Sequence, residues 1–144
     1  MVAAICYRMR KSGEIEFLLV RTRAGRWTFP KGGVDGDPSG AVAASREAHE
    51  EAGVVGHVEA APFTAYLHAK KARGTHRVHA HLCEVHRLER PSEAYRMPTW
   101  FSSDKAKRRL CEDRLPPYGR ELARVVDHAV HRVTRRHRHL LRSA

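Results

Sequence analysis

Apolar residues occur in short runs over the first part of the chain, and residues that favour turns bound each run. Residues 2–8 and 15–21 are rich in β-branched and other apolar side chains, and the turn-like segment 11–14 separates them. We therefore expect two strands joined by a tight turn. The segment 23–34 that follows contains too many glycines and prolines to form a helix.

Residues 40–52 have the composition of a helix, because they are rich in alanine and glutamate. Gly53 is well placed to end this helix, since glycine readily adopts the left-handed conformation of a C-terminal cap. At the other end, Asp37 and Ser39 are both candidate N-caps, with Pro38 near the first turn.

The second half of the chain continues with strand and helix patterns. Residues around 57–69 and residues 77–85 are typical of strands, and residues 100–101 are expected to end another short one. In the strand at 77–85, one face is predicted to carry Val78, Ala80 and Leu82, with Glu84 as a further candidate. Helices are expected at 102–111 and, with an amphipathic pattern, from 117 to about 134.

This order of elements predicts an α+β or mixed α/β fold, because the strands come first, one helix interrupts them and another closes the chain. The length of 144 residues suits one domain with a substantial core. We find no internal repeat and no linker, so a single domain over residues 1–144 is expected, with a basic amphipathic helix from about 117.

The cysteines and the hydropathy exclude several classes of protein. Cys6, Cys83 and Cys111 are odd in number and widely spaced, which favours buried thiols over a disulfide framework or a zinc site. No segment approaches the ~20 apolar residues that span a bilayer. The apolar start lacks the basic region of a signal peptide, so we expect a cytoplasmic protein without membrane insertion.

The net charge of +11 favours polyanionic partners, which include nucleic acid, acidic lipid and small polyphosphates. Charge alone does not choose among them, so the choice depends on a site. The helix at 40–52 carries Glu47, Glu50 and Glu51 at positions i, i+3 and i+4, which share one helical face. Three carboxylates there repel one another unless a cation lies among them, and Mg²⁺ prefers such oxygen ligands. The alternative is an ordinary solvated acidic helix.

Sequence around these glutamates resembles the box of the Nudix hydrolase family, G-x5-E-x7-R-E-U-x-E-E-x-G-U, in which U is apolar. The matching residues are Gly32, Arg46, Glu47, Ala48, Glu50, Glu51, Gly53 and Val54. The chain departs from the pattern at Pro38, where the box has its first glutamate, and Asp35 or Asp37 is the candidate substitute. Residues 26–32 and 96–101 extend the resemblance, the former toward diadenosine polyphosphate hydrolases and diphosphoinositol polyphosphate phosphohydrolases.

The resemblance implies an α/β/α sandwich in which a mixed sheet lies between helices and the box forms a loop–helix–loop. It also implies Mg²⁺-dependent hydrolysis of a phosphoanhydride bond, with Mn²⁺ as a possible substitute for the metal. In that interpretation Glu47, Glu50 and Glu51 bind the metal, and Glu47 or Glu51 is the candidate base. The same interpretation gives Lys31 and Gly32 contacts with phosphate, and gives Arg46 and Gly53 a structural role.

Substrate contacts are predicted from the basic segment between two strands, where loops commonly carry specificity. Its candidate substrate-binding residues are Lys70, Lys71, Arg73 and Arg77, and the alternative for this segment is a solvated turn. Tyr66 or Trp27 is a candidate for stacking on a base, with core packing as the alternative for Trp27. A dinucleoside polyphosphate is the favoured substrate, followed by a diphosphoinositol polyphosphate.

Two features motivate a second hypothesis, in which a catalytically weakened Nudix domain binds polyphosphate or RNA. The first is Pro38, and the second is the basic tail at 132–142. Because no aromatic residue interrupts that tail, specific binding of nucleic acid is less expected than binding of a small polyphosphate. Glu93 is a further candidate carboxylate for the site, although most loop glutamates are simply solvated.

Overall fold

The computed structural model describes residues 1–70 and 74–143, with Lys70 described by its backbone only. The strands are β1 (Val2–Met9), β2 (Ile15–Arg21), β3 (Trp27–Thr28), β4 (Lys31–Gly32), β5 (Val54–Val58), β6 (Thr64–Lys70), β7 (Gly74–Leu88) and β8 (Thr99–Ser102). The helices are α1 (Gly40–Ala52), α2 (Ser103–Cys111) and α3 (Pro116–Ser143), with a 3₁₀ turn η1 (Ala94–Arg96).

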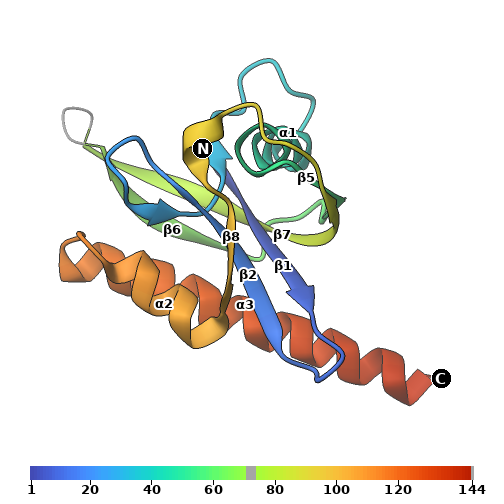
Figure 1. Cartoon of the computed structure of the whole chain (residues 1–144). Helices are drawn as coiled ribbons and strands as arrows, with labels where there is room; N and C mark the ends of the chain where they lie inside the picture. The colour runs from blue at the N-terminus through green and yellow to red at the C-terminus, as the bar shows by residue number, and fades with distance from the viewer. Residues whose placement is uncertain (71–73, 144) are drawn as a thin grey trace.

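The strands form a mixed sheet whose central path runs β3-β2-β1-β7-β5. β1 pairs in parallel with β7, and the other pairings are antiparallel. β4 pairs with β1, β6 pairs with β7 and β8 pairs with β2. The helices cover both faces of this sheet (Figure 1), which confirms the expected mixed α/β architecture.

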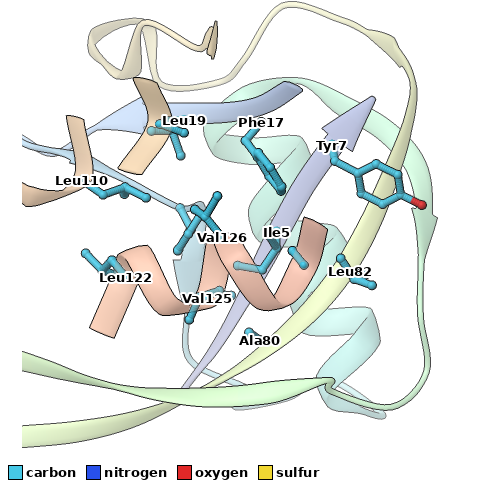
Figure 2. Packing of buried hydrophobic residues seen from close by; sticks show 14 of the residues in the cluster. Ile5, Tyr7, Phe17, Leu19, Ala80, Leu82, Leu110, Leu122, Val125 and Val126 are labelled. Carbon is cyan, nitrogen blue, oxygen red and sulfur yellow. The ribbon is translucent and has the colours of Figure 1, made fainter. Parts of the chain in front are cut away.

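Alternation along β1 explains the two layers of core. Ala3, Ile5 and Tyr7 belong to the cluster that includes the buried residues of α2 and α3 (Figure 2). The intervening Val2, Ala4 and Cys6 belong to the cluster that α1 completes with its alanines. Because successive side chains of a strand point to opposite faces, one central strand supplies both layers.

Helix α1 has the bounds predicted from sequence, and its two caps explain why. The Ser39 hydroxyl accepts a hydrogen bond from the Val42 N–H, so Ser39 and not Asp37 is the N-cap. Gly53 ends the helix with φ 69° and donates its N–H to carbonyls of the last turn. A Cβ on Gly53 would lie 1.9 Å from the carbonyl oxygen of Glu89, so the backbone just after β7 approaches too closely for any side chain.

The prediction of one strand around residues 57–69 is wrong, because this region forms the end of β5 and most of β6, with a connection between them. The expected strand at 77–85 lies inside the longer β7. Its Val78, Ala80 and Leu82 are buried as predicted, but Glu84 is exposed. His81 and Cys83 of the other face are buried as well, because α1 covers that face.

Helix α3 extends beyond its predicted end near residue 134 and continues to Ser143. All residues from Arg135 to Ser143 are exposed. This part of the helix therefore lacks the repeat of buried apolar residues from which a helix is predicted. Leu140 and Leu141 are the exposed apolar residues of this last stretch. Within residues 1–70 and 74–143, no helix is long and apolar enough to cross a membrane. The expectation of buried thiols holds for Cys6 and Cys83 but is wrong for Cys111, which is exposed.

The first half of α3 also covers the outer side of β6, which pairs with β7 through its other side. The Leu67 N–H donates to the Glu121 carboxylate at 3.2 Å, and Arg124 donates to the Ala65 carbonyl oxygen at 2.6 Å. Arg124 also donates to the Thr64 hydroxyl at 3.0 Å. Two helix side chains therefore satisfy backbone groups that a neighbouring strand would otherwise pair with.

Candidate active site

Helix α1 places two of the predicted glutamates against the protein and the third toward solvent. The alanines at one side of the helix pack on the sheet, and this contact fixes which side faces the loops. The side chains of Glu47 and Glu51 are 13% and 3% exposed, whereas that of Glu50 is 45% exposed. Glu47 and Glu51 lie one turn apart, and they share a hydrogen bond.

Strand β4 brings a stretch of backbone against this pair. The Lys31 N–H donates to Glu51 Oε2 at 3.2 Å. At Gly32, a Cβ would lie 2.2 Å from Glu47 Oε1, so only glycine leaves the Glu47 carboxylate its present position. β4 is held there by pairing with Val2 and Ala3 of β1. Lys31 and Gly32 thus contact the two glutamates through their backbone, and their contacts with phosphate stay a prediction.

Glu51 is an acid with an unusual protonation equilibrium. Burial is the largest cause that raises its pKa, to about 8, and the hydrogen bond with Glu47 raises it further in the same direction. Arg96 and Lys31 oppose the shift, because positive charges favour the ionised carboxylate. In the metal-free protein Glu51 is therefore largely protonated at neutral pH.

This raised pKa predicts how stability depends on pH in the metal-free protein. Between the ordinary pKa of 4.5 and about 8, folded Glu51 keeps a proton that the unfolded chain releases. The free energy of unfolding therefore falls as pH rises through this window and levels off above it. The expected difference from a Glu51→Gln variant is on the order of 5 kcal/mol across the whole window.

Thermal unfolding in the presence of a chelator, at several pH values from 5 to 9, measures this contribution. The wild-type Tm is expected to fall relative to that of Glu51→Gln, whose side chain does not titrate. Subtracting the two curves removes the contribution of the histidines. Parallel curves at all pH values would contradict the raised pKa.

Arg46 ties the helix to the loop that precedes it. Its guanidinium contacts Asp37 at 2.8 Å, Glu47 at 2.9 Å and Glu50 at 3.5 Å, and donates to the Gly33 carbonyl oxygen at 3.2 Å. Of the two aspartates beside Pro38, it is thus Asp37 that reaches Arg46. Arg46 orients the glutamates by the same contacts.

Arg96 is a residue of the site that the analysis of the sequence missed. Its side chain is 17% exposed and contacts Glu51 Oε1 at 3.4 Å and Glu93 Oε2 at 2.5 Å. It also donates to the Arg21 carbonyl oxygen at 3.2 Å. Glu93, a candidate carboxylate of the site, therefore holds Arg96 in place. No local signal in η1 distinguishes Arg96 from a surface arginine.

The remaining candidates divide between the site and other places. Lys31 Nζ contacts the Thr28 hydroxyl at 3.2 Å, close to the glutamates. Arg77 is exposed and lines a separate cavity with Glu121 and Arg124. Lys71 and Arg73 lie outside the described residues, as does the side chain of Lys70.

Both aromatic candidates for stacking on a base belong to the core instead. Tyr66 is 2% exposed and Trp27 is 7% exposed. Trp27 lies edge-on to Phe101, with ring centroids 5.0 Å apart, and the Arg21 guanidinium covers its face. The expectation that Tyr66 or Trp27 stacks on a base is therefore wrong, because neither ring offers an open face.

The donor set of the site suits a hard divalent cation. The carboxyl groups of Glu47 and Glu51 lie within hydrogen-bonding reach of each other, and oxygen ligands of this kind are those that such a cation prefers. Within residues 1–70 and 74–143, no three acidic, histidine or cysteine side chains already converge on one point. Glu50 is instead turned toward Arg46. Glu47 and Glu51 are thus the two carboxylates that the fold already brings together, and the metal-binding role of all three glutamates stays a prediction.

The family model of the NUDIX domain matches residues 1–122 of the chain. The chain belongs to the Nudix family. A curated relative, "Nudix hydrolase 18, mitochondrial" from Arabidopsis thaliana, is 46% identical over 66 residues. That alignment covers 41% of this chain and 38% of the relative, so the chain matches well under half of the relative's length.

Solved structures confirm the Nudix fold over nearly the whole chain. A C. elegans Ap4A hydrolase in a binary complex is 21% identical with a TM-score of 0.68, and the match covers 92% of this chain and 96% of that one. The NUDIX domain of Shewanella oneidensis NrtR complexed with ADP ribose is 18% identical with a TM-score of 0.68, covering 92% and 86%. At these identities the likeness shows the fold alone.

Proposed function

We propose that this Nudix domain is a hydrolase that cuts a phosphoanhydride bond in a polyphosphate substrate with the help of Mg²⁺. The observation that carries the proposal is the pair of Glu47 and Glu51, in which Glu51 is fixed against the β4 backbone and beside Arg96. A buried acid with a raised pKa beside a second carboxyl group is typical of sites where protons or metals are handled. A solvated acidic helix, the alternative considered from the sequence, does not bury its carboxylates.

Glu47, Glu50 and Glu51 would hold the metal. When bound, a divalent cation neutralises phosphate charge and lowers the pKa of a water bound to it. Mn²⁺ is the expected substitute, because its ligand preference resembles that of Mg²⁺. Each carboxylate must release its proton to bind, so metal affinity is expected to rise with pH.

The chain's own residues supply orientation and proton transfer. Lys31 N–H and Arg96 each contact one oxygen of Glu51, so the carboxyl group is held in one plane. A base works best when its pKa lies near the operating pH, and the raised pKa of Glu51 therefore makes it the proposed proton acceptor. Lys31 and the Gly32 backbone are proposed to contact phosphate, while Arg46 fixes Glu47.

A dinucleoside polyphosphate is the proposed substrate, and a diphosphoinositol polyphosphate is the next candidate. The net charge of +11 favours a highly anionic molecule. The printed names of two similar structures, an Ap4A hydrolase and a domain complexed with ADP ribose, support a nucleotide with linked phosphates. Lys70, Lys71 and Arg73 stay predicted substrate contacts. The cytoplasmic location also stays a prediction, since the Arabidopsis relative is named mitochondrial.

Phosphate release from a panel of substrates tests the proposal. The panel holds diadenosine tetra- and hexaphosphate, a diphosphoinositol polyphosphate, ADP-ribose and oxidised dGTP, each with and without Mg²⁺. Turnover of the diadenosine compounds that needs the metal and disappears in Glu50→Gln is the expected result. No phosphate release from any of these substrates, with folded protein and bound metal, would overturn the proposed hydrolase function.

One structural observation supports the second candidate, a Nudix domain that binds polyphosphate or RNA without cutting it. No acidic residue follows Asp127, and the last turns of α3 expose Arg135, Arg138 and Arg142. Binding of RNA that persists without Mg²⁺, weakens steeply with salt and yields no product would favour this function. Loss of that binding on removal of the last turns would locate it on α3.

A further inference from the structure

Two arginines meet at one end of the molecule without any acidic partner. Arg26 lies in the loop between β2 and β3, and Arg114 lies in the turn between α2 and α3, and both segments occupy the same end in Figure 1. Among the described residues, no carboxylate forms an ion pair with either guanidinium, although the chain pairs many of its other arginines.

Carbonyl oxygens satisfy these two arginines only in part. Arg114 donates to the Leu110 carbonyl oxygen at 2.7 Å, and Arg26 donates to the Asp113 carbonyl oxygen at 3.5 Å. Arg26 Nε is buried and has no hydrogen-bond partner in the described part of the chain. Burial and then repulsion from Arg26 lower the pKa of Arg114. Two partly desolvated cations next to each other are unfavourable unless an anion joins them.

A small cavity opens beside the two guanidinium groups. It has a volume of about 110 Å³ and is lined by Arg26, His68, Ala69, Arg114, Leu115 and Tyr118. Pockets that enclose a whole drug-sized ligand measure roughly 300–1,000 Å³, so this cavity suits a single group of a larger molecule. Its two guanidinium forks match the oxygens of a phosphate, which arginine binds in a bidentate manner.

Tyr66 is a buried residue on which both Arg114 and Glu51 of the acid pair act electrostatically. Its hydroxyl is buried and has no hydrogen-bond partner among the described residues. Burial raises the pKa of Tyr66, and both Arg114 and Glu51 act on it electrostatically. The tyrosine thus lies within electrostatic reach of the cationic cavity and of the site where the bond is cut.

We propose that Arg26 and Arg114 form a second phosphate subsite, which holds a phosphate group of the substrate that is remote from the bond being cut. This inference rests on the proposed hydrolase function and deepens it. The subsite selects substrates by the length of their phosphate chain, because a short chain leaves it unfilled. The preferred substrate is accordingly a long polyphosphate, such as diadenosine hexaphosphate rather than the triphosphate.

Binding of inorganic tripolyphosphate, measured by calorimetry with a chelator present, tests the subsite apart from catalysis. The wild type is expected to bind, and Arg26→Gln and Arg114→Gln are each expected to weaken binding about tenfold or more. Arg108→Gln is the matched control, because it removes the same charge from an exposed position of α2.

Kinetics on diadenosine triphosphate and hexaphosphate give the second readout. Both variants are expected to lower kcat/KM for the hexaphosphate about tenfold relative to the triphosphate, mainly through KM. Arg114→Gln also removes a hydrogen bond to the Leu110 carbonyl oxygen. If that variant does not fold, Arg26→Gln alone tests the subsite.

Unchanged tripolyphosphate binding in Arg26→Gln, or equal losses on both substrates, would overturn the subsite. No turnover of any substrate by a wild type that still binds tripolyphosphate through these arginines would overturn the hydrolase function instead. The two failures are therefore distinguishable.

Discussion

Replacement of Glu51 by glutamine is expected to lower kcat/KM by a factor on the order of 10²–10⁴, the range that a positioned acid or base contributes. Glutamine keeps the size, but its single amide oxygen can accept from only one of the two donors, the Lys31 N–H or Arg96, which contact different oxygens of Glu51. The glutamine amide cannot take up a proton at this pH, and its neutral oxygen is a weaker ligand for a divalent cation than a carboxylate. The variant is expected to fold, because the buried site loses an acid whose pKa is already raised to about 8.

Steady-state kinetics on the diadenosine substrates, together with the Tm of each protein, measure this effect. Glu14→Gln is the control, since Glu14 is an exposed residue of the turn between β1 and β2. A Glu51→Gln variant with wild-type kcat/KM would show that the buried acid serves only the fold. In that case Glu47 and Glu50 would have to carry the chemistry alone.

Replacement of Gly32 by alanine is expected to lower kcat/KM about 10²-fold while the protein keeps nearly all of its stability. The new methyl group would lie 2.2 Å from Glu47 Oε1, so the carboxylate has to move. Moving the end of a flexible side chain costs the fold little. A displacement of about 1 Å at a reacting group is nevertheless enough to cost about 10²-fold in rate.

Gly33→Ala is the matched control, because a Cβ there meets nothing closer than Asp35 Oδ2 at 3.9 Å. It is expected to keep wild-type activity and Tm. If Gly32→Ala also retained its activity, the position of the Glu47 carboxylate would not matter to the reaction. A Gly32→Ala protein that failed to fold would instead show that the clash extends to the backbone.

Local signals explain why helix α1 was predicted with its true bounds. Ser39 and Gly53 act within one turn of the helix ends, and alanine and glutamate favour the helix between them. The spacing of Glu47, Glu50 and Glu51 follows directly from that helix. The sequence therefore predicted which acids share a face, although it left open which of them is buried.

Contacts between distant segments explain what the sequence did not predict. Arg96 reaches Glu51 only because β8 and the turn before it return to β2 beside the helix. Arg26 and Arg114 are brought together by the packing of α2 on the sheet, which no local pattern encodes. The residues in the last turns of α3 are all exposed. The apolar repeat from which the helix was predicted therefore ends before the helix itself ends.

The contacts of α3 with β6 have a consequence for how copies of this protein can associate. An open sheet edge is a template on which another chain can add a strand, and repeated addition leads to fibrils. Glu121 accepts a hydrogen bond from the Leu67 N–H, and Arg124 donates one to the Ala65 carbonyl oxygen. These are backbone groups with which such a strand would have to pair. A chain shortened before Glu121 would expose that template, so the C-terminal helix also protects the protein against self-assembly into insoluble polymers.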